Sequence, residues 1–457
     1  MGPMRAAHIF GKRYPDAAHY RVNLYGSLGA TGKGHLTNET LLHELGEDRT
    51  TLYEYPEIYL PEHPNGMLFQ AFDADEKLLG EWTVFSIGGG DIREKGSDGI
   101  FLEEGSPFSN EDIYELSTMQ DILQWCRKNG RMLWEYVDLH EKPGYMDYLA
   151  TVWKCMKESV ENGLKHEGML PGGLHLQRKA IQYNIKAQGY DRSLRTRGLI
   201  FSYALAVAEE NAGGGAIVTA PTCGSAAVIP AVLYHSHKNY NITEERILKG
   251  LATAGLIANI VKTNASISGA EVGCQGEIGV ACSMASAAAN QIFGGTIYQT
   301  EYAAEMGLEH HLGLTCDPMC GLVQIPCIER CAFAAVRAFD TNVYAALSDG
   351  HHRVSFDEVV KVMKQTGHDL PALYKETSMG GLALMNPDED YCYGKRLPFD
   401  RSLDGICERS YYARRFHFAG IRTRYLRECA LSAYDFGFLS RQVARNALPY
   451  DTSQAGA

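Results

Sequence analysis

The chain has 457 residues, a formal net charge of −12, and 45% hydrophobic and 21% charged residues. This balance is typical of a globular protein with two or three domains, and the acidic charge argues against a nucleic-acid partner. The longest uncharged stretches, 211–234 and 278–300, are too interrupted by proline, glycine or polar residues to span a membrane. Residues 1–7 are too short and too polar for a secretory signal, so we expect a cytoplasmic protein.

Alternating apolar residues predict strands in the first third of the chain. Three such runs occupy residues 19–28, 67–72 and 82–87, and turn-forming clusters rich in glycine separate them. We therefore expect residues 1–142 to form an α+β domain that binds substrate or regulates.

Beyond Lys142-Pro143-Gly144, the hydrophobic period changes to that of helices. Alanine-rich segments with helical spacing cover residues 148–160, 198–211, 247–260, 284–292 and 329–347. Residues 143–384 are therefore expected to form a mostly helical domain, so that the fold class of the whole chain is α+β.

The last residues differ in composition from the rest. Residues 393–457 contain ten arginines but one lysine, Lys395, and show only short amphipathic stretches such as 425–438. We expect residues 385–457 to be an atypical extension that is dispensable for folding. It is either a small basic appendage or a non-native continuation of the reading frame.

The cysteines are the strongest chemical signal. Twelve cysteines in a chain without a secretory signal favour metal binding or catalysis over disulfides. Cys274, Cys316 and Cys327 each have a glycine or proline within two residues, which lets the backbone approach an inorganic cluster closely. Their spacing matches neither a four-cysteine ferredoxin run nor a zinc Cys-x2-Cys pair. Small buried side chains in an alanine-rich core are therefore an open alternative.

Three longer segments resemble the signatures of bacterial iron–sulfur L-serine dehydratases. They are NASISGAEVGCQGE at residues 264–277, EH followed by LGLTCDP at residues 309–318, and VQIPCIER at residues 323–330. The intervals of 42 and 11 residues between the three cysteines in these segments also match the family's ligand spacing. The resemblance extends from Met1 to about Leu384.

This resemblance implies a [4Fe–4S] cluster bound by Cys274, Cys316 and Cys327, with one iron left without a protein thiolate. That iron would bind the hydroxyl of L-serine as a Lewis acid. The expected activity is that of an L-serine ammonia-lyase, which eliminates water from serine to give pyruvate and ammonia. The resemblance also implies a homodimer. The neighbouring cysteines are expected to be ordinary packing residues: Cys282, Cys320 and Cys331.

The elimination also needs a base, because the α-hydrogen of serine is only weakly acidic. The segment TGKGH at residues 31–35 fails as a phosphate loop, since the required glycine and serine or threonine are replaced by Ser27 and Gly34. Together with YGSL at residues 25–28, this segment resembles the family's histidine loop, which implies His35 as the base.

Four further polar side chains are expected to hold the substrate. His63 and Asn65 match a second family position, which implies that they help to hold serine. Thr222 and Ser268 are candidates for hydrogen bonds to its carboxylate, with bonding to nearby backbone as the alternative. The active site is then expected between the two domains, with His35 and His63 facing the cluster.

The two ends depart from the family pattern. The family carries a segment with serines and a histidine just before the Gly-Pro-Met that stands at residues 2–4 here, and we expect the chain to be truncated relative to it. Family chains finish with a cysteine that caps the open iron. Cys392 is the nearest candidate here, and 65 residues follow it.

Two other functions fit parts of the sequence. A pyridoxal-phosphate-dependent hydroxy-amino-acid dehydratase would catalyse the same reaction through a lysine Schiff base, for which Lys262 is the candidate. A non-catalytic iron–sulfur sensor would have a fully ligated cluster and would not need the loop that carries His35.

Overall fold

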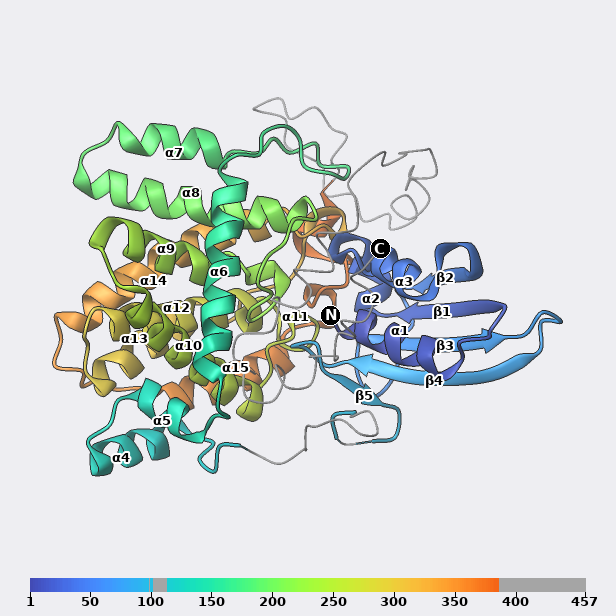
Figure 1. The fold of residues 1–457 in the computed structure, drawn as a ribbon, viewed down its shortest axis with the longest axis horizontal. Coiled ribbons are helices and arrows are strands. Elements are labelled where there is room, and N and C mark those ends of the chain that lie inside the picture. The colour runs from blue at the N-terminus through green and yellow to red at the C-terminus, as the bar shows by residue number, and fades with distance from the viewer. Residues whose placement is uncertain (98, 102–112, 386–457) are drawn as a thin grey trace, which may run out of the picture.

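The computed structural model describes residues 1–97, 99–101 and 113–385. They form two packing units that lie side by side, one built on a sheet and one made of helices (Figure 1). This confirms the expected fold class. The expected extension lies outside the described residues, together with Cys392.

Five strands form one sheet in the N-terminal unit. They are β1 (His19–Tyr25), β2 (Thr50–Tyr55), β3 (Gly66–Phe72), β4 (Leu78–Ser86) and β5 (Ile92–Glu94). Their order across the sheet is β2-β1-β3-β4-β5, with β1 parallel to β2 and the other neighbours antiparallel. The alternating runs correctly predicted β1, β3 and β4, and they missed β2 and the three-residue β5.

Helices cover the sheet and close its core (Figure 1). They are α1 (Gly2–Arg13), the short α2 (Ser27–Thr31) and α3 (Thr37–Leu45). Phe10 of α1 packs its ring against Tyr20 and Phe69, with centroids 6.1 and 5.5 Å apart. Leu41 and Leu45 of α3 belong to the same core. This packing holds the loop between α2 and α3, which carries His35, against a rigid sheet.

The remaining helices form the second unit around α12. They are α4 (Met119–Asn129), α5 (Leu133–His140), α6 (Tyr145–Gly163), α7 (Ala180–Gln188), α8 (Arg192–Ala212), α9 (Val228–Tyr240), α10 (Glu244–Asn264), α11 (Gly269–Val272), α12 (Val280–Ile292), α13 (Ile297–Glu309), α14 (Cys327–Ala346) and α15 (Phe356–Asp369). Every residue of α12 except Gln291 is buried. It packs against α9, α10, α13 and α14. The five segments predicted as helical lie within α6, α8, α10, α12 and α14.

Small residues allow these helices to approach one another closely. A Cβ on Gly307 of α13 would stand only 2.7 Å from the Cα of Ser283 in α12. The Ser283 hydroxyl donates to the carbonyl of Ala304 at 2.6 Å, so the polar group at this contact is satisfied. The alanine-rich composition of α12 therefore reflects close packing on several sides.

The helical core begins earlier in the chain than the hydrophobic period indicated. Met119 of α4 and Leu133 of α5 belong to the same core as α6 and α8, although both precede the boundary expected at residue 142. Phe101 instead packs against the core of the sheet unit. We therefore propose that the two domains divide between Phe101 and Tyr114.

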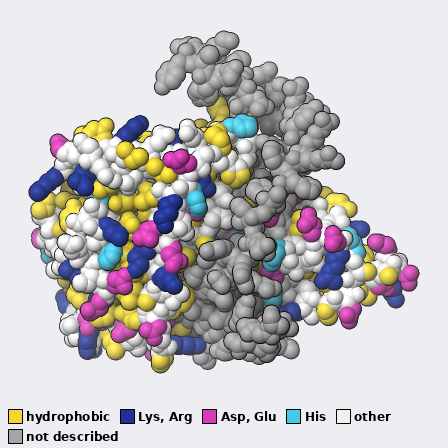
Figure 2. All heavy atoms as spheres, turned by 45° about the horizontal axis from the view of Figure 1, so that its top comes forward, with side chains coloured by type: hydrophobic (Ala, Val, Ile, Leu, Met, Phe, Trp, Pro, Cys, Tyr) yellow, Lys and Arg dark blue, Asp and Glu magenta, His cyan; other side chains and the backbone are white. Residues whose placement is uncertain are grey.

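The visible surface carries charges of both signs. On the face shown in Figure 2, acidic and basic side chains are interspersed over both units. Among the described residues, no helix combines the length and the apolar character needed to cross a membrane.

Gly163, the last residue of α6, tests the close packing of the helices. A Cβ there would lie 2.2 Å from the carbonyl oxygen of Ala206 in α8. Although alanine favours a helix, Gly163→Ala is expected to lower the free energy of unfolding by about 1–3 kcal/mol, the usual cost of overpacking. The measurement is the midpoint of thermal unfolding followed by circular dichroism.

Gly189→Ala is the matched control, because its Cβ would meet Lys186 only at 3.5 Å. An equal fall of the midpoint in both variants would contradict the packing argument.

Candidate active site

The chain leaves regular helical geometry around Cys274. Gly273 caps the end of helix α11. Its φ of +75° favours glycine, and a Cβ at this residue would stand only 2.7 Å from the carbonyl oxygen of Leu314. Cys274 follows, and a π-helical turn, Gln275–Gly279, leads into α12. Such turns interrupt the regular hydrogen-bond ladder and are frequent at functional sites.

Cys316 and Cys327 come from two other segments. Cys316 follows α13 in extended chain, and its backbone N–H donates to the carbonyl of Tyr374 at 2.8 Å. Cys327 is the first residue of α14, where the helix dipole favours negative charge on a sulfur.

The structure brings the three thiols together. A hydrogen bond with Cys274, together with burial, raises the pKa of Cys316 well above its usual value. Burial and the neighbouring Cys274 raise the pKa of Cys327 as well. Cys274 and Cys316 are buried and Cys327 is half-buried. Their proximity agrees with the expectation that the three sulfurs converge, and their role as ligands remains a prediction.

Charged groups surround the thiols. Arg330 of α14 is hydrogen-bonded to the thiol of Cys274 and donates to the carbonyl of Thr315 at 2.7 Å. The thiol of Cys316 lies 3.5 Å from Oε2 of Glu277. Burial and the carboxylate of Glu376 raise the pKa of Glu277.

This donor set fits an iron–sulfur cluster better than a single ion. Within the described parts of the chain, no group of three or more His, Cys, Asp or Glu side chains is arranged to hold one metal ion. A cluster carries each protein ligand on a different iron, so its ligand sulfurs stand further apart than around one ion. Three thiols also match the soft ligands that such clusters take.

His35 links the sheet unit to the helical unit. It lies at the end of the 3₁₀ turn Gly32–His35. Its Nε2 is 2.9 Å from Oε1 of Glu376, and its Nδ1 is 3.0 Å from the sulfur of Cys223. Burial lowers the pKa of His35, but its contacts with Cys223 and Glu376 outweigh burial and raise this pKa well above the usual value.

His63 and Asn65 lie beside the Cys274 segment. The backbone N–H of Asn65 donates to Nδ1 of His63 at 3.0 Å, and Nε2 of His63 lies 3.3 Å from Oε1 of Glu271. Oδ1 of Asn65 is buried and has no hydrogen-bond partner. A buried amide oxygen of this kind is available to accept a hydrogen bond from a ligand.

The hydroxyl of Thr222 bonds to a side chain rather than to nearby backbone, and its contact with substrate remains a prediction. Its hydroxyl donates to Oε1 of Glu277 at 2.7 Å, on the side of Glu277 away from Cys316. Ser268 is buried, and its backbone N–H donates to the hydroxyl of Ser266 at 3.1 Å.

The other nearby cysteines form hydrogen bonds elsewhere, although Cys331 is close enough to Cys274 and Cys327 to interact with them electrostatically. The thiol of Cys282 donates to the carbonyl of Ala334 at 3.4 Å inside the helical core. The thiol of Cys331 donates to the carbonyl of Gly224 at 3.2 Å, and Cys320 is exposed.

Lys262 lies in a buried contact between the two units. Its amine is 2.8 Å from Oδ2 of Asp91, whose other oxygen lies 3.6 Å from Arg5. A lysine engaged in this way is poorly placed to form a Schiff base with a cofactor.

Sequence reasoning missed three groups in this region: Cys223, Glu277 and Glu376. Glu277 and Glu376 both lie in segments that resemble the family. The sequence of such a segment does not indicate which side chains a carboxylate will contact in the folded protein. Cys223 directly follows Thr222, a predicted substrate contact. This position next to Thr222 was the only feature of the sequence that could have indicated a role for Cys223.

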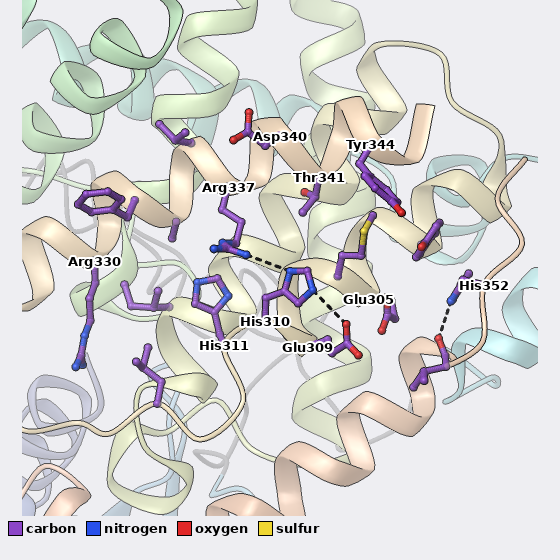
Figure 3. Close-up of a pocket in the computed structure, with 18 of the residues that line it drawn as sticks. Glu305, Glu309, His310, His311, Arg330, Arg337, Asp340, Thr341, Tyr344 and His352 are labelled. Carbon is purple, nitrogen blue, oxygen red and sulfur yellow. Dashed lines mark hydrogen bonds and ion pairs between the residues drawn. The ribbon is translucent and has the colours of Figure 1, made fainter. Parts of the chain in front are cut away.

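A large cavity lies apart from the predicted substrate residues. It has a volume of about 770 Å³ and opens between α13 and α14, with Arg330 at one end and His352 at the other (Figure 3). Arg337 lies 3.1 Å from His310, which in turn lies 3.4 Å from Glu309. None of the six predicted site residues lines this cavity, so its size does not identify it as the active site.

Comparison with known proteins covers both units. The family model for the serine dehydratase alpha chain matches residues 110–383, and the model for the beta chain matches residues 1–52 and 44–97. An L-serine dehydratase of Streptomyces coelicolor is 40% identical over 437 residues, which cover 84% of this chain and 94% of that protein. An L-serine dehydratase of Haemophilus influenzae is 38% identical over 441 residues, and L-serine dehydratase TdcG of Escherichia coli is 37% identical over 438. Each of these two alignments covers 84% of this chain and 95% of the relative.

Gly34 tests the contact that positions His35. A Cβ on Gly34 would stand 2.1 Å from the carbonyl oxygen of Gly321 and 2.9 Å from the Cα of Leu322. Gly34→Ala must therefore displace the histidine loop from the helical unit. We expect amide hydrogen exchange in residues 27–36 and 319–324 to accelerate roughly tenfold, while the sheet core stays protected.

The control for Gly34→Ala is Gly99→Ala, because the nearest atom to its Cβ, Oγ of Ser97, is 4.0 Å away. Unchanged exchange in Gly34→Ala would show that the two loops do not depend on this contact.

Proposed function

Because the chain belongs to the L-serine dehydratase family, an enzyme family of ammonia-lyases, we propose that it eliminates water from L-serine at a [4Fe–4S] cluster held by Cys274, Cys316 and Cys327. The chain is a lyase, and its products are pyruvate and ammonia. The observation that carries the proposal is the meeting of three thiols from separate segments beside Glu277, which also interacts electrostatically with His35 of the other unit. We further propose a cytoplasmic homodimer.

The cluster, when bound, would supply an iron without a protein thiolate, which acts as a Lewis acid on the departing hydroxyl of serine. Cys274, Cys316 and Cys327 would hold it as thiolates. The hydrogen bond from Arg330 to Cys274 would then stabilise the negative charge of that sulfur.

His35 is the proposed base. A carboxylate of Glu376 accepts the proton of Nε2, which leaves Nδ1 as the basic nitrogen. The sulfur of Cys223 lies 3.0 Å from Nδ1 and marks the direction in which this nitrogen faces. To reach Nδ1, the α-hydrogen of serine would have to replace the thiol contact, and it would then pass to this nitrogen. The resulting 2-aminoacrylate tautomerises and hydrolyses to pyruvate and ammonia.

His63 and Asn65 are the proposed substrate-holding groups. The unpaired, buried Oδ1 of Asn65 suits the ammonium group of serine, which must donate hydrogen bonds. Glu271 beside His63 keeps that imidazole oriented. These residues come from the segment before β3, so the substrate would lie between the sheet unit and the thiols.

The two rival functions fit less well. A pyridoxal-phosphate mechanism requires a reactive lysine, and the amine of Lys262 pairs with Asp91 at 2.8 Å. A sensor needs no base, whereas His35 is held on both ring nitrogens.

Reconstitution with iron and sulfide tests the cluster. Anaerobic reconstitution should give an enzyme that produces pyruvate from L-serine, loses activity in air and regains it with ferrous iron and reductant, because an iron without a thiolate is exposed to oxidants. Cys274→Ser should lower bound iron and abolish the activity. Cys282→Ala is the control, since Cys282 lies in the helical core, and it should retain the iron. Full activity after aerobic dialysis against a chelator would refute the iron mechanism.

The pH dependence of turnover tests His35. Only neutral imidazole takes a proton, and the contacts of His35 raise its pKa. The value of kcat/KM should therefore rise with pH through a pKa above the value of about 6.5 of an ordinary histidine. Glu376→Gln removes a stabilising charge and should move this rise to lower pH. His35→Ala should lower kcat roughly a hundredfold or more without unfolding the protein.

The measurement is the pH profile of pyruvate formation for the wild type and both variants. An unmoved profile in Glu376→Gln, or wild-type turnover in His35→Ala, would remove His35 from the role of base.

A further inference from the structure

The thiol of Cys223 is part of an arrangement that the proposed elimination does not use. Cys223 is half-buried and opens the 3₁₀ turn Cys223–Ser225 between α8 and α9. Its sulfur lies 3.0 Å from Nδ1 of His35, and Nε2 of the same ring lies 2.9 Å from Glu376. The three side chains therefore form a Cys–His–Glu series, in which a base contacts a thiol and a carboxylate orients the base.

Neighbouring groups hold the thiol in place. The side-chain amide of Asn211 donates to the carbonyl of Cys223 at 3.0 Å, and the backbone N–H of Ser225 donates to the carbonyl of Thr222 at 3.3 Å. Because the backbone at Thr222 and Cys223 is hydrogen-bonded, the main chain that carries the thiol is held next to His35 by the fold.

This environment differs from that of the other non-cluster cysteines in the helical core. Burial raises the pKa of Cys126 and that of Cys282 to about 12, and it also raises the pKa of Cys331. Such thiols stay protonated and inert. A thiol next to an imidazole that a carboxylate holds in place can pass its proton to the ring, which is the usual means of activating a nucleophile.

We propose that Cys223 is a nucleophilic thiol in the proposed serine site and that small electrophilic carboxylic acids, including the 2-aminoacrylate that the enzyme forms, modify it covalently. This inference rests on the proposed function for the identity of the electrophile. The reactivity of the thiol rests on the Cys223–His35–Glu376 contacts alone.

The covalent step needs no further reactant. Once Nδ1 of His35 has passed the α-proton to the departing hydroxide, it takes the thiol proton of Cys223. The sulfur then attacks the β-carbon of 2-aminoacrylate while its nitrogen is still the ammonium group inherited from serine, because a neutral enamine nitrogen would make that carbon nucleophilic. The electron pair of the carbon–carbon double bond moves to the α-carbon, which takes the proton back from Nδ1. One sulfur–carbon and one carbon–hydrogen bond form, the double bond and the sulfur–hydrogen bond are consumed, and a thioether remains on Cys223. The base of the elimination is then blocked by the adduct beside it.

Alkylation with iodoacetamide tests the reactivity of the thiol. The reconstituted holoenzyme would be labelled under anaerobic conditions, so that cluster ligands are protected, and labelled peptides would be quantified by mass spectrometry. Cys223 should react roughly tenfold or more faster than Cys320, an exposed cysteine that serves as the internal control. His35→Asn should remove this advantage, and Glu376→Gln should reduce it, while the rate at Cys320 stays constant.

Labelling of Cys223 no faster than Cys320, or labelling that His35→Asn leaves unchanged, overturns the proposal. Circular dichroism of each variant shows whether a lost advantage comes from unfolding, and Cys320 labelling provides the same check within each sample.

Prolonged turnover of L-serine tests the identity of the electrophile. The wild type should gain the mass of one 2-aminoacrylate on the peptide that contains Cys223, and Cys223→Ser should gain none. Saturating L-serine should also slow iodoacetamide labelling of Cys223. An enzyme that forms pyruvate without the adduct, or without protection by serine, overturns the assignment of Cys223 to the serine site. An enzyme that forms no pyruvate contradicts the proposed function instead, and the labelling comparison still decides the reactivity of Cys223.

Discussion

Two hydrogen bonds of one imidazole ring join the sheet unit to the helical unit at the candidate site. His35 reaches Cys223 at 3.0 Å and Glu376 at 2.9 Å, and both partners belong to segments far away in the sequence. A second contact between the units pairs the buried Asp91 with Lys262 at 2.8 Å. This ion pair adds to the contacts that hold the two units together. The geometry of His35 therefore depends on how the two units dock.

The thiols depend in turn on close helix packing. Cys274 leads into α12, Cys327 begins α14, and Cys316 follows α13, so the helices that pack around α12 also fix the three sulfurs. Glycine at residues 269 and 273 lets the neighbouring segments approach the chain around Cys274 closely. A Cβ on Gly269, for example, would lie 2.7 Å from the side chain of Glu277. Overpacking at such positions would move a ligand before it unfolded the protein.

The properties of the candidate site depend on charged side chains that are buried away from water. Glu277 and Glu376 lie near the same thiols, and burial together with mutual repulsion raises the pKa of Glu277. Glu376 instead faces an imidazole that compensates its charge. Two carboxyl groups of one site thereby have different surroundings. The same imidazole acts on the substrate and, in our proposal, on Cys223.

The sequence by itself predicted most of the secondary structure and the three thiols that we propose as ligands. Alternation at residues 67–72 distinguishes the two faces of a strand, and a local period of this kind can be read from the sequence alone. The glycine and proline residues beside Cys274 and Cys327 likewise indicate the local conformation of the backbone. Tertiary structure decided the rest. It joined α4 and α5 to the helical core, and it brought Glu376 and Cys223 to His35 across 341 and 188 residues. A contact over such a separation leaves no period or spacing in either segment, because only the docking of the two units creates it.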